Sequence, residues 1–156
     1  MNYPGKKVFI EYGSGAGEFT SHFLERMDED AVIVALETNE YFVDKLKEID
    51  DPRLKVIHDG AENTPAVMKE LGLGKADYII SGIPFTLHPL EMRKEIVKQT
   101  ADLLKDDGSF IVYQYSTYMK RFLKEEFQNI TTGFTMFNIP PMFVMKASEK
   151  FRTTSE

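Results

Sequence analysis

The chain has 156 residues, of which 42 % are hydrophobic, so one folded domain with a real core is expected. It contains no cysteine, which excludes disulfides, thiolate zinc sites and cysteine nucleophiles and suits a reducing cytoplasm. The net charge of −6 argues against a general nucleic-acid binder, because such proteins usually carry a basic face.

Two hydrophobic patterns alternate along the chain. Short continuous apolar runs predict buried strands over residues 7–13, 31–37, 54–60, 76–81 and 109–116. Apolar residues at helical spacing predict helices over 17–27, 40–49, 65–73, 89–104 and 118–127, the fourth stopped by 106–108. Residues 131–150 predict two strands joined at 138–141. This alternation indicates a mostly parallel sheet with helices on both faces, closed by an antiparallel hairpin.

The first predicted strand ends in "EYGSGAG", which places Glu11 before Gly13, Gly15 and Gly17. Ligands of open parallel sheets bind beyond the carboxyl ends of the strands, and glycines there let the backbone come close. The spacing is G-x-G-x-G, not the G-x-G-x-x-G of dinucleotide sites. An acid beside these glycines does not favour a pyrophosphate but attracts a sulfonium or α-ammonium cation. A tight strand–helix turn without a ligand is the alternative.

Two further acids follow the next strands. Glu37 ends the second strand, roughly 20 residues past the glycines, where a carboxylate can bridge ribose hydroxyls. Asp59 ends the third strand, where it can accept from an adenine amino group while Gly60 and Ala61 support the ring edge. Together the three strand ends describe S-adenosylmethionine better than NAD.

With these residues, the whole chain resembles class I S-adenosylmethionine-dependent methyltransferases. "IEYGSGAGEFT" is similar to the ELGPGTGxFT-type motif of rRNA adenine dimethyltransferases and bacterial phospholipid N-methyltransferases. The rRNA enzymes carry an Asn-Leu-Pro-Tyr-type motif after the fourth strand, whose Asn or Asp holds the target amine. Here Ser81-Gly82-Ile83-Pro84-Phe85 resembles the Ser-Gly-Leu-Pro motif of the phospholipid enzymes. "VYQYST" and "FNIPPMFVMKA" resemble two later segments of the same enzymes.

The resemblance implies an α/β, Rossmann-like methyltransferase fold. Its seven-stranded, mostly parallel sheet has the order 3-2-1-4-5-7-6, with an antiparallel last strand and helices on both faces. One methyltransferase domain over 1–156 is expected, without the N-terminal helical segment usual in the family. The implied cofactor is S-adenosylmethionine, with S-adenosylhomocysteine as product. The expected cofactor-binding residues are Glu11, Gly13, Ser14, Gly15, Gly17, Glu37, Thr38, Asp59, Gly60, Ala61 and Ser81.

The implied activity is N-methylation of a phospholipid amine headgroup like that of phosphatidylethanolamine. The expected substrate-binding residues are Gly82, Ile83, Pro84, Phe85, Tyr118 and Asn138. Aromatic faces and carbonyl oxygens can stabilise the ammonium cation that forms, and Phe85, Tyr115 and Tyr118 are expected to form such a pocket. Tyr115, a phenol at the end of the fifth strand, is the expected catalytic residue, which orients the amine or relays its proton. Ordinary strand packing suits Tyr115 equally well, and a hydrophobic plug under the loop is the alternative for Phe85.

Other readings of these residues stay open. His88 as a base is disfavoured against a helix-capping or solvent-facing role. Lys120 and Arg121 either meet a lipid phosphate or form a solvated helix face, which is the favoured alternative. The same cofactor site also suits methylation of RNA or a small molecule, or a remnant that binds the cofactor without turnover. The net charge and the missing Asn or Asp weigh against adenine in RNA.

The expected partners follow from these features. They are a phospholipid or another small amine, with nucleic acid disfavoured. No metal is expected, because the histidines lack metal-binding spacing. No apolar run approaches the ~20 residues that span a bilayer, so we expect a soluble cytoplasmic protein. Any membrane contact is expected to be peripheral, at the inner face.

Overall fold

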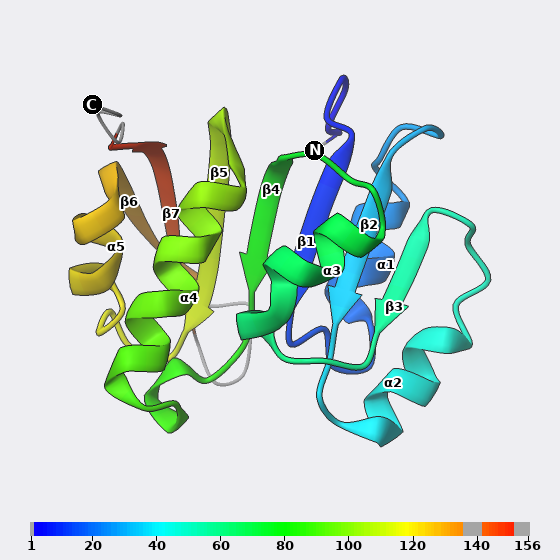
Figure 1. Ribbon diagram of the computed structural model, residues 1–156, viewed down its shortest axis with the longest axis horizontal. Coiled ribbons are helices and arrows are strands. Elements are labelled where there is room, and N and C mark those ends of the chain that lie inside the picture. The colour runs from blue at the N-terminus through cyan, green and yellow to red at the C-terminus, as the bar shows by residue number, and fades with distance from the viewer. Residues whose placement is uncertain (1, 136–141, 152–156) are drawn as a thin grey trace.

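A computed structural model describes residues 2–135 and 142–151. Seven strands form one sheet in the order β3-β2-β1-β4-β5-β7-β6, and β7 runs antiparallel to β5 and β6 (Figure 1). The strands are β1 Val8–Tyr12, β2 Val32–Leu36, β3 Leu54–Ile57, β4 Ala76–Ser81, β5 Leu104–Gln114, β6 Phe127–Thr135 and β7 Met142–Lys150. The predicted strand order and the antiparallel last strand are confirmed.

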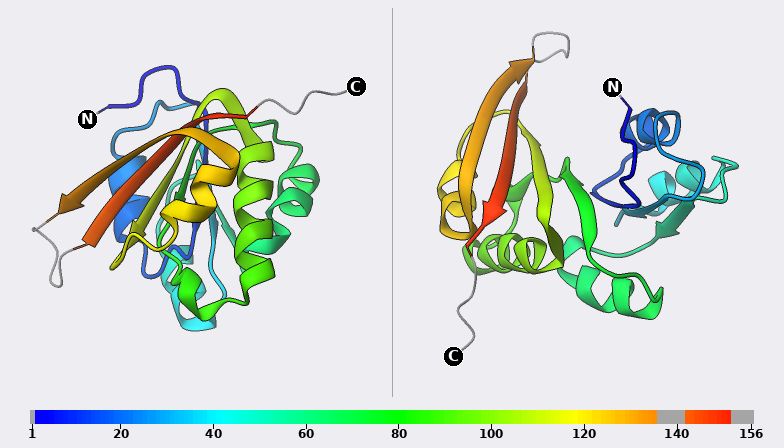
Figure 2. Two further views of the ribbon diagram at one scale, coloured as in Figure 1. Left: turned by 90° about the vertical axis from the view of Figure 1, so that its left-hand side faces the viewer. Right: turned by 90° about the horizontal axis from the view of Figure 1, so that it is seen from above.

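Five helices cover the two faces of this sheet: α1 Glu18–Leu24, α2 Glu40–Lys47, α3 Thr64–Glu70, α4 Leu90–Leu103 and α5 Lys120–Glu126. Two 3-10 turns, η1 Ala61–Asn63 and η2 Phe85–Leu87, follow β3 and β4. Helices α1 and α2 lie on one face, and α3, α4 and α5 lie on the other (Figure 2). The predicted helices are confirmed, with ends a few residues shorter.

The core is split by the sheet into two layers. Successive strand residues point to opposite faces, so Phe9 packs with Phe23 of α1 while Ile10 and Tyr12 pack on the side of α4. The buried Tyr12 hydroxyl bonds the Thr100 hydroxyl of α4 at 3.0 Å, which satisfies the phenol inside the core. The central strands are therefore held from both sides, which fixes the positions of their carboxyl ends.

The start of β5 differs from the prediction. Residues 106–108, expected as a turn after α4, lie within β5, which begins at Leu104. Leu104 pairs with Ala76, and the register then shifts before Ser109 pairs with Tyr78. A Cβ at Gly108 would lie 3.0 Å from the Lys105 carbonyl oxygen and 3.1 Å from that of Ala76. The glycine that the sequence analysis took as a helix stop thus lies in a tight strand irregularity, where a side chain would push against two carbonyl oxygens.

The carboxyl ends of the parallel strands gather at the lower edge of the sheet in Figure 1. The connections after β1, β2, β3 and β4 meet there, as expected for a sheet whose order reverses between β1 and β4. The expected β6–β7 connection at 138–141, including Asn138, lies outside the described residues. Within the described part of the chain, no helix has the length and apolarity needed to cross a membrane.

Candidate functional site

The turn after β1 is shaped by close approach of the loop after β4. Gly13 has a positive φ of 67° and donates its N–H to the Leu36 carbonyl at 2.8 Å. A Cβ at Gly13 would lie 2.5 Å from the Cγ2 atom of Ile83, so only glycine lets the two loops meet here. Gly15, by contrast, has nothing within 4 Å of a Cβ position and faces open space.

Glu37 at the end of β2 holds that turn in place. One carboxylate oxygen accepts from the Gly15 N–H at 2.8 Å, and the other accepts from the Asn39 N–H at 2.9 Å. The side chain is 8 % exposed. A carboxylate has about four lone-pair sites, so each oxygen keeps the capacity to accept a further hydrogen bond.

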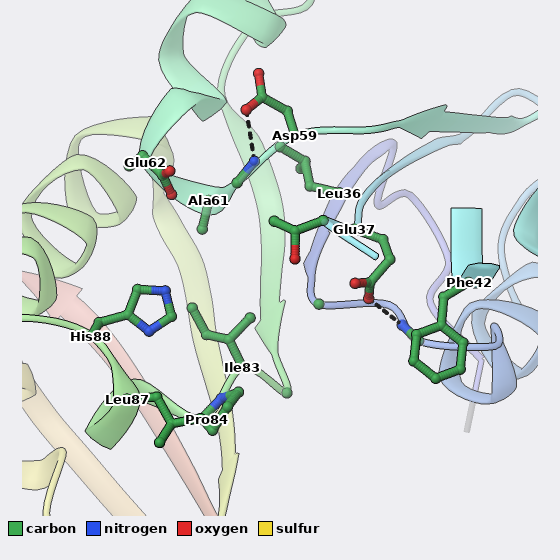
Figure 3. Close-up of a pocket in the computed structure, with 15 residues that line it drawn as sticks. Leu36, Glu37, Phe42, Asp59, Ala61, Glu62, Ile83, Pro84, Leu87 and His88 are labelled. Carbon is green, nitrogen blue, oxygen red and sulfur yellow. Dashed lines mark hydrogen bonds between the residues drawn. The ribbon is translucent and has the colours of Figure 1, made fainter. Parts of the chain in front are cut away.

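A first cavity of about 400 Å³ lies between the β2 end and the loop after β4 (Figure 3). Glu37 and Phe42 stand on one side of it, and Pro84, Leu87 and His88 stand on the other. The remaining wall residues are Gly13, Gly15, Leu36, Thr38, Asp59, Gly60, Ala61, Glu62, Gly82 and Ile83.

Two polar groups in the wall of the first cavity have unused hydrogen-bonding capacity. Oδ1 of Asp59 accepts from the Gly60 N–H and from the Asn63 side chain, both at 2.7 Å. In the described part of the chain its Oδ2 has no hydrogen-bond partner, and neither does the buried Nδ1 of His88. Oδ2 of Asp59 suits a ligand that donates a hydrogen bond, such as the amino group of a nucleobase, whereas Nδ1 of His88 is enclosed by protein and offers no surface to a ligand.

A second cavity of about 260 Å³ lies beside the first and is walled by Glu11. Glu11 is only 2 % exposed, and this burial raises the pKa of its carboxyl group to about 7. The Thr20 hydroxyl donates a hydrogen bond to the carboxylate, which stabilises the ionised form and opposes the rise in pKa. Phe19 and Tyr113 stack across the rim with ring centroids 4.8 Å apart. The other wall residues are Gly13, Ser14, Gly15, Ala16, Glu18, Ile80, Gly82 and Met142. A buried acid with so little solvation favours a cationic ligand.

A third cavity of about 180 Å³ opens beyond the ends of β4 and β5. Tyr113 and Tyr115 both line it, and Tyr115 is 65 % exposed. The Gln114 side chain donates to the Ile83 carbonyl at 2.6 Å and ties the loop after β4 to β5. The remaining wall residues are Gly82, Pro84, Thr86, Ser116 and Met142.

Gly82 lines all three cavities. Its N–H donates to the Tyr12 carbonyl at 3.1 Å, which holds it between the ends of β1 and β4. The three cavities therefore form one trough along the carboxyl edge of the sheet, with Gly82 at the meeting point. We use "the trough" below for this combined space.

Solved structures of methyltransferases have the same architecture as this chain. The precorrin-6y C5,15-methyltransferase from Geobacter metallireducens GS-15 superposes with a TM-score of 0.71 at 16 % identity, over 92 % of this chain and 80 % of that one. The magnesium protoporphyrin IX methyltransferase from Synechocystis PCC 6803 with bound SAM gives 0.68 at 16 % identity, over 92 % and 70 %. The chain has the class I methyltransferase fold. The fold predicted from the resemblance is confirmed.

Two sequence comparisons add to this. An ornithine lipid N-methyltransferase from Singulisphaera acidiphila is 24 % identical over 138 residues, which cover 86 % of this chain and 72 % of that protein. A family model described as the TrkA-N domain matches residues 14–86, from the glycine turn to the loop after β4.

Most of the expected cofactor residues line the trough of this methyltransferase fold. They are Glu11, Gly13, Ser14, Gly15, Glu37, Thr38, Asp59, Gly60 and Ala61. Gly17 and Ser81 are placed elsewhere. A Cβ at Gly17 would meet Ile49 at 2.8 Å and Leu46 at 3.0 Å, so Gly17 packs α1 against α2. Ser81 is fully buried, and its hydroxyl faces the Ile83 N–H at 3.4 Å under the loop.

The expected acceptor residues are also divided. Gly82, Ile83, Pro84 and Tyr115 line the trough. Phe85 is fully buried in the core beside α4, as the plug alternative requires, and lines none of the three cavities. Tyr118 also lines none of the three cavities, and its hydroxyl accepts hydrogen bonds from Arg93 and Arg121. The structure thus does not bring Phe85, Tyr115 and Tyr118 into one aromatic pocket.

Several wall residues were missed from the sequence. Tyr113 had a signal, since it lies two residues before Tyr115 within the predicted strand 109–116, and alternate residues of a strand share a face. Phe19, Phe42 and Met142 had none, because apolar residues at helical or strand spacing are read as core. These three side chains line the trough only because the fold brings together segments that are far apart in the sequence.

Proposed function

We propose that this chain binds S-adenosylmethionine in the trough and methylates an amine acceptor at its open end. The observation that carries the proposal is the meeting of three chemically different cavities at Gly82. One cavity suits a nucleoside, one suits a cation, and one opens toward aromatic side chains at the surface.

The residues present fit this cofactor. Glu37 would accept from the ribose hydroxyls with its remaining lone pairs, and Oδ2 of Asp59 would accept from the adenine amino group. Glu11 would face the α-ammonium group, whose positive charge favours the ionised carboxylate and lowers its raised pKa. When bound, the cofactor supplies a methyl group on a positively charged sulfur.

The chain's own contribution to the chemistry would be alignment and proton removal. An acceptor ammonium must lose a proton before its nitrogen lone pair can form a bond to carbon. Tyr115, exposed at the rim of the third cavity, is the proposed group that orients the amine and passes this proton to solvent. Gln114 keeps the Ile83 carbonyl engaged, so the loop after β4 is held in place while the acceptor binds.

A lipid headgroup amine is the proposed acceptor. The relative from Singulisphaera acidiphila is named as an ornithine lipid N-methyltransferase, and residues 81–85 carry no Asn or Asp that would hold an adenine amine. Two large apolar side chains also stand exposed near this edge: Leu87 of η2 is 79 % exposed, and Phe134, close to the end of β6, is 55 % exposed. Peripheral contact with a membrane surface is proposed for this edge.

Calorimetry tests the cofactor first. Micromolar binding of S-adenosylmethionine and S-adenosylhomocysteine is expected, and absence of binding by both contradicts the proposal. Labelled-methyl transfer to phosphatidylethanolamine vesicles then tests the acceptor. Transfer to RNA or to a soluble amine in preference to the vesicles contradicts the lipid assignment. Binding without transfer to any acceptor would identify a cofactor-binding remnant.

A further inference from the structure

Two arginines share one phenol beside the trough. Arg93 of α4 donates from Nη1 to the Tyr118 hydroxyl at 2.8 Å, and Arg121 of α5 donates to the same oxygen from Nη2. The guanidinium carbons lie 5.3 Å (Arg93) and 4.4 Å (Arg121) from the Tyr118 ring centroid. Arg121 also lies 4.6 Å from the ring centroid of Phe122. Both cations are therefore held against aromatic faces.

Neither arginine has a carboxylate partner in the described part of the chain. The other two described arginines, Arg26 and Arg53, pair with Glu25 and Asp51 at 2.9 Å and 2.7 Å. Carboxylates are not scarce, because the chain has 25 acidic residues against 19 basic ones. Two cations on one neutral oxygen repel each other, and an anion between them would turn that repulsion into attraction.

The two arginines have different tasks. Arg93 is committed to the protein: its Nε donates to the His88 carbonyl at 2.7 Å and its Nη2 donates to the Thr86 carbonyl at 3.0 Å. Arg121 is exposed, and among the described residues its Nε and Nη1 have no acceptor. Arg93 thus fixes a positive charge at the site, while Arg121 offers free donors in the fork geometry that matches an oxyanion.

The arginines adjoin the acceptor end of the trough. Thr86, whose carbonyl Arg93 holds, lines the third cavity, and His88 lines the first. Ser116, whose hydroxyl accepts from the Tyr118 N–H at 3.4 Å, also lines the third cavity. An acceptor amine in the third cavity would therefore have the arginines beside the remainder of its headgroup.

We infer that Arg93, Arg121 and Tyr118 form an oxyanion subsite that selects zwitterionic acceptors. The amine would enter the third cavity, and a phosphodiester or carboxylate of the same headgroup would accept hydrogen bonds from Arg121 beside the fixed positive charge of Arg93. The inference rests on the proposed function and narrows its substrate class. A headgroup with an amine and no anion would leave the two cations unpaired and bind more weakly.

Kinetics on vesicles test the inference with Arg121→Gln and a matched control. Lys124→Gln removes a positive charge from an exposed residue one turn further along α5. Arg121→Gln is expected to raise the KM for phosphatidylethanolamine in neutral carrier vesicles about 10- to 100-fold, the usual range for loss of a charge-assisted hydrogen bond. Lys124→Gln should leave this KM unchanged, and Arg121→Lys should restore part of it.

Assays with two other methyl acceptors show which anionic group of the headgroup is recognised. An N-acylated ornithine lipid presents a carboxylate, and oleylamine presents an amine alone. The KM of the ornithine lipid should rise with Arg121→Gln if a carboxylate serves, whereas the KM of oleylamine should not move. A KM unchanged by Arg121→Gln on both zwitterions overturns the inference. So does an equal rise on oleylamine, which would reveal a general structural effect.

A binding measurement keeps the inference testable without turnover. Glycerophosphoethanolamine added to the protein saturated with S-adenosylhomocysteine should shift the Arg121 Nε–Hε resonance in NMR spectra, and inorganic phosphate should do so more weakly. A shift equal for both would mean a free-anion site, and preferential binding of a short RNA would mean a nucleic-acid site; either overturns the inference. If vesicle lipids are not methylated but the headgroup still binds through Arg121, the proposed acceptor fails while the subsite stands.

Discussion

The Glu37 carboxylate accepts a hydrogen bond from the Gly15 N–H at 2.8 Å, so the end of β2 fixes the turn that follows β1. The second carboxylate oxygen is engaged by the Asn39 N–H at the start of α2. Both donors are backbone N–H groups, so the side chain must present an acceptor oxygen to each of them. One side chain thus sets the shape of the first cavity and also supplies lone pairs to its interior.

Glu37→Gln should weaken binding of S-adenosylmethionine about 10- to 100-fold. The variant keeps one acceptor oxygen but replaces the other with an NH₂ group, which points a donor at a backbone N–H. The lost interactions are hydrogen bonds to a charged group, which contribute roughly 1.5–3 kcal/mol each. Calorimetry measures the effect, and Glu40→Gln, an exposed acid in the first turn of α2, is the control for charge. Equal affinities of the two variants would rule out Glu37 as a cofactor ligand.

Gly13→Ala should lower stability more than Gly72→Ala does. The two glycines have nearly the same φ, +67° and +66°, so both variants carry the left-handed strain of roughly 1–2 kcal/mol. At Gly72 the new Cβ meets nothing within 4 Å, whereas at Gly13 it would lie 2.5 Å from Ile83 Cγ2. Displacing Ile83 should add about 1–3 kcal/mol, measured by denaturant unfolding.

The double variant Gly13→Ala/Ile83→Ala tests the cause of that difference. In the Ile83→Ala background, Gly13→Ala should lower the free energy of unfolding no more than Gly72→Ala lowers it in the wild type, because the clash is with the Ile83 methyl group. If the additional loss persists in the double variant, the contact between the two loops is not its source.

Much of the fold was predictable because the central strands carry their signal locally. The predicted strand over residues 76–81, centred on the apolar residues Tyr78, Ile79 and Ile80, is β4 to the residue. The position of Glu37 and Asp59 in the wall of the first cavity was predictable, because parallel strands bring their carboxyl ends to one edge whatever the details of packing. The start of β5 was not predictable from the sequence. Asp106-Asp107-Gly108 has the composition of a turn, and the pairing of β5 with β4 is a tertiary contact.

The acceptor end was predicted less well for a physical reason. The sequence shows that residues 81–85 interrupt a strand, but not which of them point inward. Phe85 fills the core, and Gly82, without a side chain, is the residue that lines all three cavities. Arg93 gave no signal at all, because a charged residue on an amphipathic helix is read as solvent-facing.

Tyr115→Phe tests the proton role of the phenol. If Tyr115 orients the amine and relays its proton, the variant should lower kcat about 10- to 100-fold and change the pH profile, with the KM for the acceptor little altered. Tyr41→Phe removes a phenol of similar exposure, 64 % against 65 %, from a different surface and is the control. Wild-type kcat with an unchanged pH profile would leave Tyr115 with a packing role only.

Glu11 should make the stability of the ligand-free protein fall between about pH 4.5 and 7. Burial raises its pKa from 4.5 to about 7 in the folded state, so the folded protein holds a proton that the unfolded chain releases over this interval. Below the interval both states are protonated and no penalty arises; above it the penalty is complete. A shift of this size corresponds to about 3 kcal/mol, at 1.36 kcal/mol per pKa unit.

Glu11→Gln removes this penalty and isolates it from the other titrating groups. The variant should match the wild type near pH 4.5 and exceed its free energy of unfolding by up to about 3 kcal/mol at pH 8. Glu18→Gln, an exposed acid in the first turn of α1, should differ little from the wild type at either pH. The same Glu11→Gln variant should bind S-adenosylmethionine more weakly, since it offers no charge to an α-ammonium group. A variant that is no more stable at pH 8, or that keeps full affinity, would show that the buried carboxylate is not retained for a cationic ligand.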